Sequence, residues 1–324
     1  MKAAVCENYG GADVLVCRDV PKPEPGTGDV LVRVCAASVT RADTMMRSGT
    51  PLFARLATGL RKPKYPIPGT GFAGIVDTVG EGVSQFKVGD RVVGESGLTF
   101  SANAEYVSVQ EDGILQILPD EISFEEAAPL CDGMLTAYNF LCLIGECKPG
   151  MRVMINGASG AVGSAGVQIA KLTGAKVTGV CSGKNRDFVL AQGADRVIDY
   201  TRESLGAEGI KYDLIFDAVG TLTFSECKSL LTDNGTFLSP VLSFPLLLQM
   251  LATRCFSKKK AVFSATGLKP PSEMNVHLQK ILGFYSEQKL WTEIDRNYSL
   301  DEISQAHAYV DTGRKRGNVI LAVS

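Results

Sequence analysis

The chain has 324 residues, of which 45% are hydrophobic and 21% charged, and its formal net charge is −2. This composition is ordinary for a globular protein of one or two domains, and it argues against nucleic acid as a main partner. Because the N-terminus lacks a signal-peptide core and no run of about 18 apolar residues occurs, we expect no membrane span. Nine cysteines without a C-x-x-C pair argue against a disulfide framework, so we expect a cytoplasmic protein.

The first part of the chain, 1–124, reads as a series of short strands separated by turns. Residues 29–39 and 71–80 are rich in valine and alternate, and 85–95 has a G-D turn between two apolar stretches. The pattern continues through 103–119, and prolines separate the segments. These features predict a β-rich first domain.

From residue 123 onward the pattern changes to alternating strands and helices. Ser123 followed by glutamates predicts a helix start. Predicted strands then lie at 151–156, 175–181, 195–200, 212–220, 236–241 and 259–266, with helices at 161–174, 185–193 and 223–235. Such alternation predicts an α/β fold with a doubly wound parallel sheet. Residues 291–324 hold an amphipathic helix and a valine-rich strand that could return to the first domain.

The run Gly157-Ala-Ser-Gly160-Ala-Val-Gly163 lies between a predicted strand and a predicted helix. In that context it predicts a dinucleotide-binding G-x-G-x-x-G loop in which Ala158 replaces the first glycine. Gly160 would let the backbone approach a pyrophosphate, and Gly163 would let the helix pack against the sheet. The N–H groups at the helix start, near Ala161 and Val162, would attract negative charge. The alternative is a tight turn that binds nothing.

The end of the second strand of this unit distinguishes NADH from NADPH. An NAD site places a carboxylate there, whereas this chain has Ser182, Gly183 and Lys184, and no carboxylate before Asp187. Serine and a cation suit a 2′-phosphate, so we predict NADPH. The alternative is that Lys184 and Arg186 are merely solvated charges.

Several motifs in this order resemble the zinc-independent medium-chain dehydrogenase/reductase superfamily, in its quinone oxidoreductase (zeta-crystallin-like) branch. The motifs are SVTRADTMMRSG (38–49), YPIPGTGFAGIVDTVGEGVSQFKVGDRVVG (65–94), NAEYV (103–107), LTAYNFL (135–141), INGASGAVGSAGVQIAK (155–171), GADRVIDY (193–200), YDLIFDAVG (212–220) and RGNVIL (316–321). The resemblance implies a GroES-like β-rich domain over 1–124 and 290–324 and a Rossmann NADPH-binding domain over 125–289. It also implies a homodimer.

The resemblance further implies roles for single residues around the cofactor. Ser159, Ala161 and Val162 would meet the pyrophosphate. The other positions are Ser182, Lys184 and Tyr200 at the 2′-phosphate, Thr136, Val219 and Ser239 near the nicotinamide and its ribose, and Gly317 and Asn318 closing over the cofactor. Two residues depart from the family pattern, since asparagine is usual where Thr40 stands and aspartate is common where Gly71 stands.

Zinc-dependent relatives use a cysteine, a G-H-E and a second cysteine as catalytic ligands. Here those positions hold Thr40, the run 69–71 (Gly-Thr-Gly), and Cys131 or Asp132, which cannot form a tetrahedral zinc site, so we predict no metal. A quinone or the activated C=C of an α,β-unsaturated carbonyl needs no Lewis acid, because its conjugated system spreads the charge. The candidate proton donors are Thr40 and Tyr65, with solvent as the alternative.

Two other features leave alternatives open. Asp43 and Arg47 are spaced as an i, i+4 ion pair, which we favour over a role in the cleft. The apolar segment 241–252, followed by lysines, fits a lid over an apolar substrate, a dimer contact or a peripheral membrane contact.

The predicted function is a zinc-free, NADPH-dependent transfer of hydride to a small apolar quinone or enone. An enoyl thioester reductase is the first alternative, for which Arg55, Arg61, Lys62 and Lys64 could bind the phosphates of the carrier. A non-catalytic NADPH-binding protein is the second, because binding a cofactor does not imply turnover.

Overall fold

The computed structural model describes residues 1–323, and of Phe53 and Ala57 the backbone alone. The chain divides into two compact units: the first comprises Met1–Asp132 and Gly267–Ser324, and the second Gly133–Thr266.

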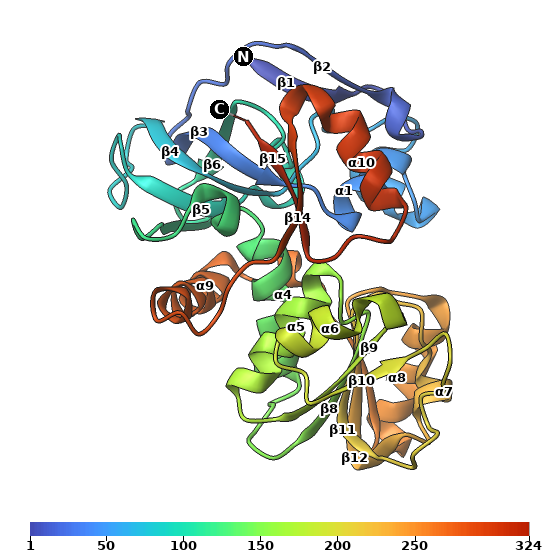
Figure 1. The fold of residues 1–324 in the computed structure, drawn as a ribbon. Helices are drawn as coiled ribbons and strands as arrows, with labels where there is room; N and C mark the ends of the chain where they lie inside the picture. Colours follow the sequence, from blue (N-terminus) through green and yellow to red (C-terminus); the bar gives the residue numbers. More distant parts are fainter. Residues whose placement is uncertain (324) are drawn as a thin grey trace. The chain divides into compact units, whose positions relative to one another are not determined.

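The first unit is built around a seven-stranded sheet, blue to teal and red in Figure 1. The order along the sheet is β14-β15-β3-β4-β5-β7, and β6 pairs with β3. The bounds are β3 Asp29–Ser38, β4 Gly71–Val79, β5 Arg91–Glu95, β6 Tyr106–Gln110, β7 Ile114–Ile117, β14 Ile294–Ser299 and β15 Asn318–Ala322. A hairpin of β1 (Lys2–Cys6) and β2 (Leu15–Asp19) and the helices α1 (Arg41–Ser48), α2 (Arg55–Thr58), α3 (Phe124–Ala127), α9 (Pro271–Ser286) and α10 (Ile303–Asp311) complete the unit.

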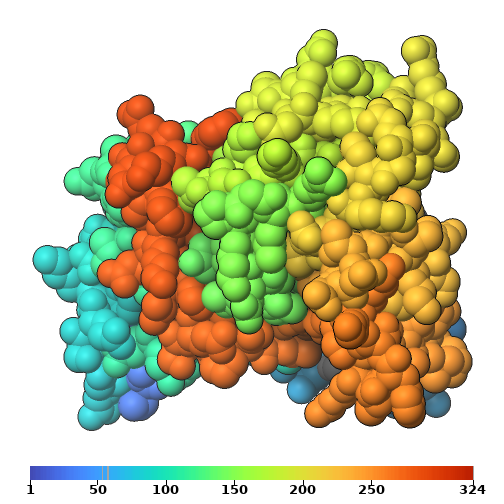
Figure 2. All heavy atoms as spheres, turned by 90° about the horizontal axis from the view of Figure 1, so that it is seen from below, coloured from blue at the N-terminus to red at the C-terminus, as the bar shows by residue number. Residues whose placement is uncertain are grey.

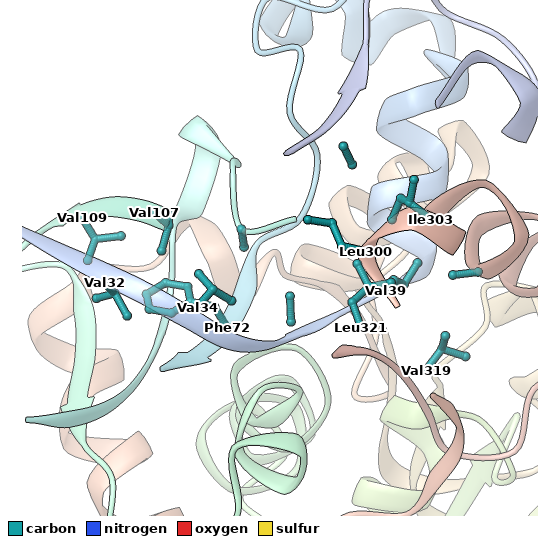
Figure 3. Close-up of a cluster of buried hydrophobic side chains, with 14 of the residues drawn as sticks. Val32, Val34, Val39, Phe72, Val107, Val109, Leu300, Ile303, Val319 and Leu321 are labelled. Atoms are coloured by element: carbon teal, nitrogen blue, oxygen red, sulfur yellow. The ribbon is translucent and has the colours of Figure 1, made fainter. Parts of the chain in front are cut away.

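Alternating valines of this sheet form the core of the first unit (Figure 3). Val32 and Val34 of β3 pack with Phe72 of β4, and all three are buried. Leu321 of β15 joins the same cluster, since β15 pairs antiparallel with β3. The predicted return of the last strand to the first domain is therefore confirmed.

The second unit is a six-stranded parallel sheet, in the order β10-β9-β8-β11-β12-β13 (Figure 1). Its strands are β8 Arg152–Asn156, β9 Lys176–Cys181, β10 Arg196–Asp199, β11 Tyr212–Asp217, β12 Leu231–Ser239 and β13 Lys260–Phe263. Its helices are α4 Leu135–Tyr138, α5 Ala161–Leu172, α6 Arg186–Ala191, α7 Phe224–Cys227 and α8 Phe244–Phe256. All of its strand pairs are parallel, which confirms the predicted α/β class.

Two predicted elements were wrong, and one strand was missed. The helix expected over 223–235 ends at Cys227, and β12 already begins at Leu231. The Asp-Asn-Gly run is a bulge within β12, where the register against β11 shifts, and not a helix end. The stretch 85–95 holds only β5, and the strand β14 was missed.

The structure also divides the chain at different places from the predicted boundaries at 125 and 289. Helix α9 belongs to the first unit, where it is tied to β7 and to the turn before this strand. Asn275 Oδ1 accepts from the Leu115 N–H (3.1 Å), and Asn275 Nδ2 donates to the Gly113 carbonyl (2.6 Å). These hydrogen bonds join residues about 160 positions apart, and periodicity does not reveal them.

The stretch Phe124–Ile144 forms one helix that is long and apolar enough to cross a membrane, with a mean hydropathy of 1.3. Of this window, 67% is buried inside the protein, as in the core helix of a soluble protein. Glu125, Glu126 and Asp132 interrupt the apolar residues here, so the sequence shows no unbroken apolar run of this length. π-helical turns at Leu130–Met134 and Asn139–Ile144 flank α4, and such turns are common near functional sites.

Candidate functional site

The predicted cofactor residues of the second unit gather at one edge of its sheet. The glycine loop follows β8, Ser182 follows β9, and Tyr200 follows β10. Val219 follows β11 by two residues, and Ser239 ends β12. Because all these strands are parallel, their carboxyl ends share one edge, where open α/β sheets bind ligands. Thr136 lies on α4, which contacts α5, the helix that follows the loop.

The chain direction across the sheet changes between β8 and β11, and the glycine loop lies at this switch point. Gly157 has φ 73°, and a Cβ there would come within 1.9 Å of Val219 Cγ2. At Gly163 a Cβ would come within 2.1 Å of the Gly157 carbonyl oxygen. Both glycines are therefore required by the chain itself, and the packing role expected of Gly163 fits this geometry.

Gly160 differs from these two glycines. Its φ is −82°, and a Cβ there would meet nothing closer than the Gly157 oxygen at 3.5 Å. Neither the backbone conformation nor internal packing requires glycine at this position. Gly160 is also the N-cap of α5 and provides no side-chain cap. An open approach to uncapped N–H groups at a helix start is the geometry that a pyrophosphate needs.

Ser159 and the turn after β11 are held by side chains that sequence reasoning missed. Asn185 Nδ2 donates to Ser159 Oγ over 3.0 Å. The buried Asp217 accepts from the N–H groups of Val219 (3.3 Å) and Gly220 (3.0 Å) on Oδ1. Ser239 is buried and donates to the Asp217 carbonyl at 3.3 Å. The Ser239 hydroxyl therefore supports the turn, whereas the Val219 side chain stays exposed.

The predicted 2′-phosphate site contains a carboxylate that the sequence analysis overlooked. Asp199, at the end of the neighbouring strand β10, lies where a Cβ on Gly183 would be 2.4 Å from Oδ2. Its Oδ1 accepts from the hydroxyl (2.7 Å) and the N–H (3.0 Å) of Thr201, and these bonds hold its pKa below the usual range. Lys184 and Tyr200 are exposed beside it. The site therefore combines the Lys184 ammonium with the Asp199 carboxylate, whose Oδ1 already accepts hydrogen bonds from Thr201.

In the first unit the favoured Asp43–Arg47 ion pair was wrong. Asp43 is the N3 residue of a capping box, and its Oδ2 accepts from the Thr40 N–H and hydroxyl, each at 2.7 Å. Arg47 instead binds Asp311 of α10 at 2.6 Å. The hydroxyl of Thr40, one of the two predicted proton donors, therefore donates its hydrogen bond to Asp43 at the start of helix α1.

Tyr65 and the two C-terminal residues predicted at the cofactor all belong to the first unit and make different contacts there. The Tyr65 ring is 6.4 Å from that of Phe100, with Lys64 Nζ 5.0 Å from its centre. Gly317 has φ 76°, and Asn318 Nδ2 donates to the Glu293 carbonyl over 3.0 Å. Their roles toward the cofactor stay predictions.

Two of the positions that hold zinc ligands in zinc-dependent relatives lie together here, the run 69–71 and Asp132. The run 69–71 contains neither histidine nor cysteine. The hydroxyls of Ser38 and Thr70 both donate to the Asp132 carboxyl. Within residues 1–323, no three His, Cys, Asp or Glu side chains are placed to hold a metal ion.

The residues of the second unit fit NADPH. The open face at Gly160, the uncapped start of α5 and the exposed Lys184 would hold its phosphates. When bound, NADPH supplies the hydride.

Comparison with known proteins supports this interpretation over the whole chain. Residues 26–120 match the family model of the alcohol dehydrogenase GroES-like domain, and residues 192–321 match that of a zinc-binding dehydrogenase. The chloroplastic quinone-oxidoreductase QR1 of Triphysaria versicolor is 32% identical, covering 99% of this chain and 98% of that protein.

Solved structures agree with the sequence comparison. The quinone oxidoreductase of Coxiella burnetii superposes with a TM-score of 0.90 at 29% identity, over 100% of this chain and 99% of the other. The Escherichia coli quinone oxidoreductase complexed with NADPH gives 0.86 at 26% identity, over 100% of both chains.

Proposed function

Because this chain belongs to the quinone oxidoreductase family of medium-chain dehydrogenases/reductases, we propose that it transfers hydride from NADPH to a small apolar quinone. The enone reaction predicted from the sequence uses the same site and is the second acceptor class to test. In both reactions conjugation carries the new charge to an oxygen, and the protein orients the acceptor and excludes water.

The observation that carries the proposal is the contrast among the loop glycines. Gly157 and Gly163 are required by the chain, whereas Gly160 leaves an open face over a helix N-terminus. The E. coli relative that matches over its full length is a complex with NADPH, which supports the same cofactor here.

The test follows absorbance at about 340 nm, where NADPH absorbs and NADP⁺ does not. Purified protein is supplied with an ortho-quinone, a short alkenal or a medium-chain enoyl-CoA, with NADH and EDTA-treated samples in parallel. We expect NADPH oxidation with the quinone that survives EDTA. Faster turnover of the enoyl-CoA would favour the thioester reductase. Tight NADPH binding without turnover of any acceptor would favour the non-catalytic alternative.

We further propose that the protein works as a homodimer in a reducing compartment such as the cytoplasm. All nine cysteines are free, which supports the compartment. For the thioester alternative, Arg61, Lys62 and Lys64 are exposed, but Arg55 Nε is bound to the Gly49 carbonyl at 2.9 Å.

Helix α8 takes up most of the apolar segment 241–252 and extends beyond it, and its outward side carries Phe244, Leu247, Leu248 and Leu251. These four residues are exposed, and the segment around α8 is amber to orange in the space-filling view (Figure 2). Of the cations that follow, Lys259 and Lys260 bind backbone carbonyls, which leaves fewer charges for a lipid surface. A lid or a dimer contact therefore fits this face better than a membrane contact.

A further inference from the structure

The second unit has a cavity of about 230 Å³ at the edge of its sheet that lies opposite to the cofactor residues. Arg152 begins β8, Lys176 begins β9 and Tyr212 begins β11, and all three line the cavity. Because these strands are parallel, their amino ends meet at this edge, whereas the glycine loop and Ser182 follow their carboxyl ends. The cavity is therefore separate from the cofactor site.

The cavity exists because the connection from β10 to β11 contains no helix. The strands lie in the order β10-β9-β8-β11, so residues 200–211, which the structure describes throughout, must cross two strands to reach β11 (Figure 1). Such crossovers usually carry a helix, but these residues form only turns and bends. Leu205 and Ile210 of the connection pack against the buried cluster that contains Met154 and Val180. They cover the interior of the sheet face, and the cavity remains at its amino edge.

Two exposed cations stand side by side at this edge. Arg152 pairs in register with Lys176, so both side chains lie on the same face of the sheet. Among residues 1–323, neither side chain makes a hydrogen bond or an ion pair, and only the Arg152 backbone N–H is taken, by Asp213 at 2.9 Å. Like charges at directly paired strand positions repel each other. An anion bound between the two side chains would remove this repulsion.

The other charged groups of the lining already have partners. Asp195 forms an ion pair with Lys171 and accepts a backbone N–H at 2.8 Å. Arg196 forms an ion pair with Glu208. These carboxylates oppose a second negative charge in the cavity, so the two free cations suit a singly charged anion better than a phosphate dianion.

The walls of the cavity are mainly apolar. Val177, Ile210 and the ring of Tyr212 contribute to them. Tyr212 is only 1% exposed, and its hydroxyl has no hydrogen-bond partner among the residues that the structure describes. A small rotation of the ring toward a bound carboxylate would give this hydroxyl a partner and remove the cost of leaving it unpaired.

We propose that the cavity binds a small monocarboxylate with an apolar body, whose carboxylate lies between the Arg152 guanidinium and the Lys176 ammonium. The apolar body contacts Ile210 and the Tyr212 ring. Arginine suits this role because its planar fork donates two parallel hydrogen bonds to a carboxylate, and lysine adds a point charge. The cavity is smaller than the pockets of about 300–1,000 Å³ that hold drug-sized ligands, so its occupant is small. This site does not depend on the proposed hydride transfer.

The test measures the binding of 2-naphthoate to the NADPH-saturated protein, in which the cofactor site is occupied and no turnover is needed. A titration observed by ligand NMR gives the Kd, and we expect saturable binding with a Kd below about 1 mM. The neutral alcohol with the same rings, 2-naphthylmethanol, should bind at least about tenfold more weakly, and so should inorganic phosphate. Naphthoate should also raise the melting temperature of the protein.

Variants then locate the bound carboxylate. Arg152→Gln and Lys176→Gln should each raise the naphthoate Kd about tenfold, with the Kd of the alcohol and of NADPH changed less than about twofold. Without ligand, both variants should be at least as stable as wild type, because the repulsion between the two cations is gone. Lys148→Gln is the matched control, since Lys148 is exposed, paired with Glu146 and outside the lining, and it should bind naphthoate as wild type does.

Four results would overturn the proposal. Equal affinity for naphthoate and for the alcohol would show that the cations contribute nothing. Binding that survives in both glutamine variants would place naphthoate at another site, and an equal loss in Lys148→Gln would reduce the effect to the general charge of the unit. No saturable binding, or phosphate that binds more tightly than naphthoate, would rule out the assigned class of ligand.

Discussion

The glycine loop of the second unit is one contiguous run, 157–163, whereas the carboxyl cluster of the first unit (Asp43, Glu95 and Asp132) draws its members from three separate segments. The loop acts through backbone: its glycines fix a turn, and its N–H groups face outward. The cluster acts through side chains whose pKa values depend on burial and on one another. The glycine loop can be recognised from consecutive residues of the sequence. The carboxyl cluster forms only when folding brings distant residues together.

This contrast separates what a substitution can do in each region. In the loop, an added methyl group changes space. In the carboxyl cluster, replacing a carboxylate by an amide of the same shape removes the charge and keeps the volume of the side chain. Changes of space in the loop therefore bring the larger effects, and changes of charge bring smaller, pH-dependent ones.

The largest effect is expected from Gly163→Ala. The new Cβ would stand 2.1 Å from the Gly157 oxygen and 2.7 Å from its carbonyl carbon, which are backbone atoms that cannot swing away. We expect the free energy of unfolding to fall by about 1–3 kcal/mol, together with loss of NADPH binding. Thermal unfolding and NADPH fluorescence measure both. Unchanged stability would show that the loop is looser than this packing implies.

Gly160→Ala is the matched substitution that sharpens the comparison within the loop. Its Cβ meets nothing closer than 3.5 Å, at a φ that alanine adopts freely. We expect stability within about 0.5 kcal/mol of wild type but an NADPH Kd about 10- to 100-fold higher, because the methyl group blocks the pyrophosphate. Equal NADPH affinity in this variant would place the phosphates elsewhere.

In the first unit, Glu95→Gln should change the pH dependence of stability. The raised pKa of Glu95 means that its contribution is full below the ordinary carboxyl pKa and is lost as pH rises through about 8. The variant should therefore match wild type near pH 5 and exceed it at pH 8.5 by about 1 kcal/mol or more. Burial lowers the pKa of Lys315 to about 8, so this group titrates in both proteins and cancels in the difference.

Calorimetry of Glu95→Gln and of Glu81→Gln, an exposed turn residue, measures this difference. The control should show a constant offset from wild type across the pH range. An offset that is equally constant for Glu95→Gln would mean that Glu95 does not exchange its proton in the folded protein.

The same contrast explains how much could be predicted from the sequence. Alternating valines and the glycine loop predicted the two-unit α/β fold and the edge of the sheet where the cofactor residues gather, because both signals are local. The Asp43–Arg47 pair was wrong because a capping box with Thr40 competes for the same carboxylate. Asp199 was missed because it reaches the end of β9 from the neighbouring strand, and no pattern within one segment shows this.

The smallest effect is expected from Lys184→Ala at the site that Asp199 shares. Lys184 is exposed, so its attraction for a 2′-phosphate is screened by water and contributes about 1 kcal/mol. We expect the NADPH Kd to rise about three- to tenfold, less at high salt, with the NADH Kd unchanged. Lys176→Ala, at the opposite end of β9, is the control and should change neither. Equal losses for both cofactors would assign Lys184 to the pyrophosphate. The Asp199 carboxylate, held by Thr201, would then lie where the ribose 2′-hydroxyl of NADH binds, and the preference for NADPH would have to come from Tyr200 and Ser182.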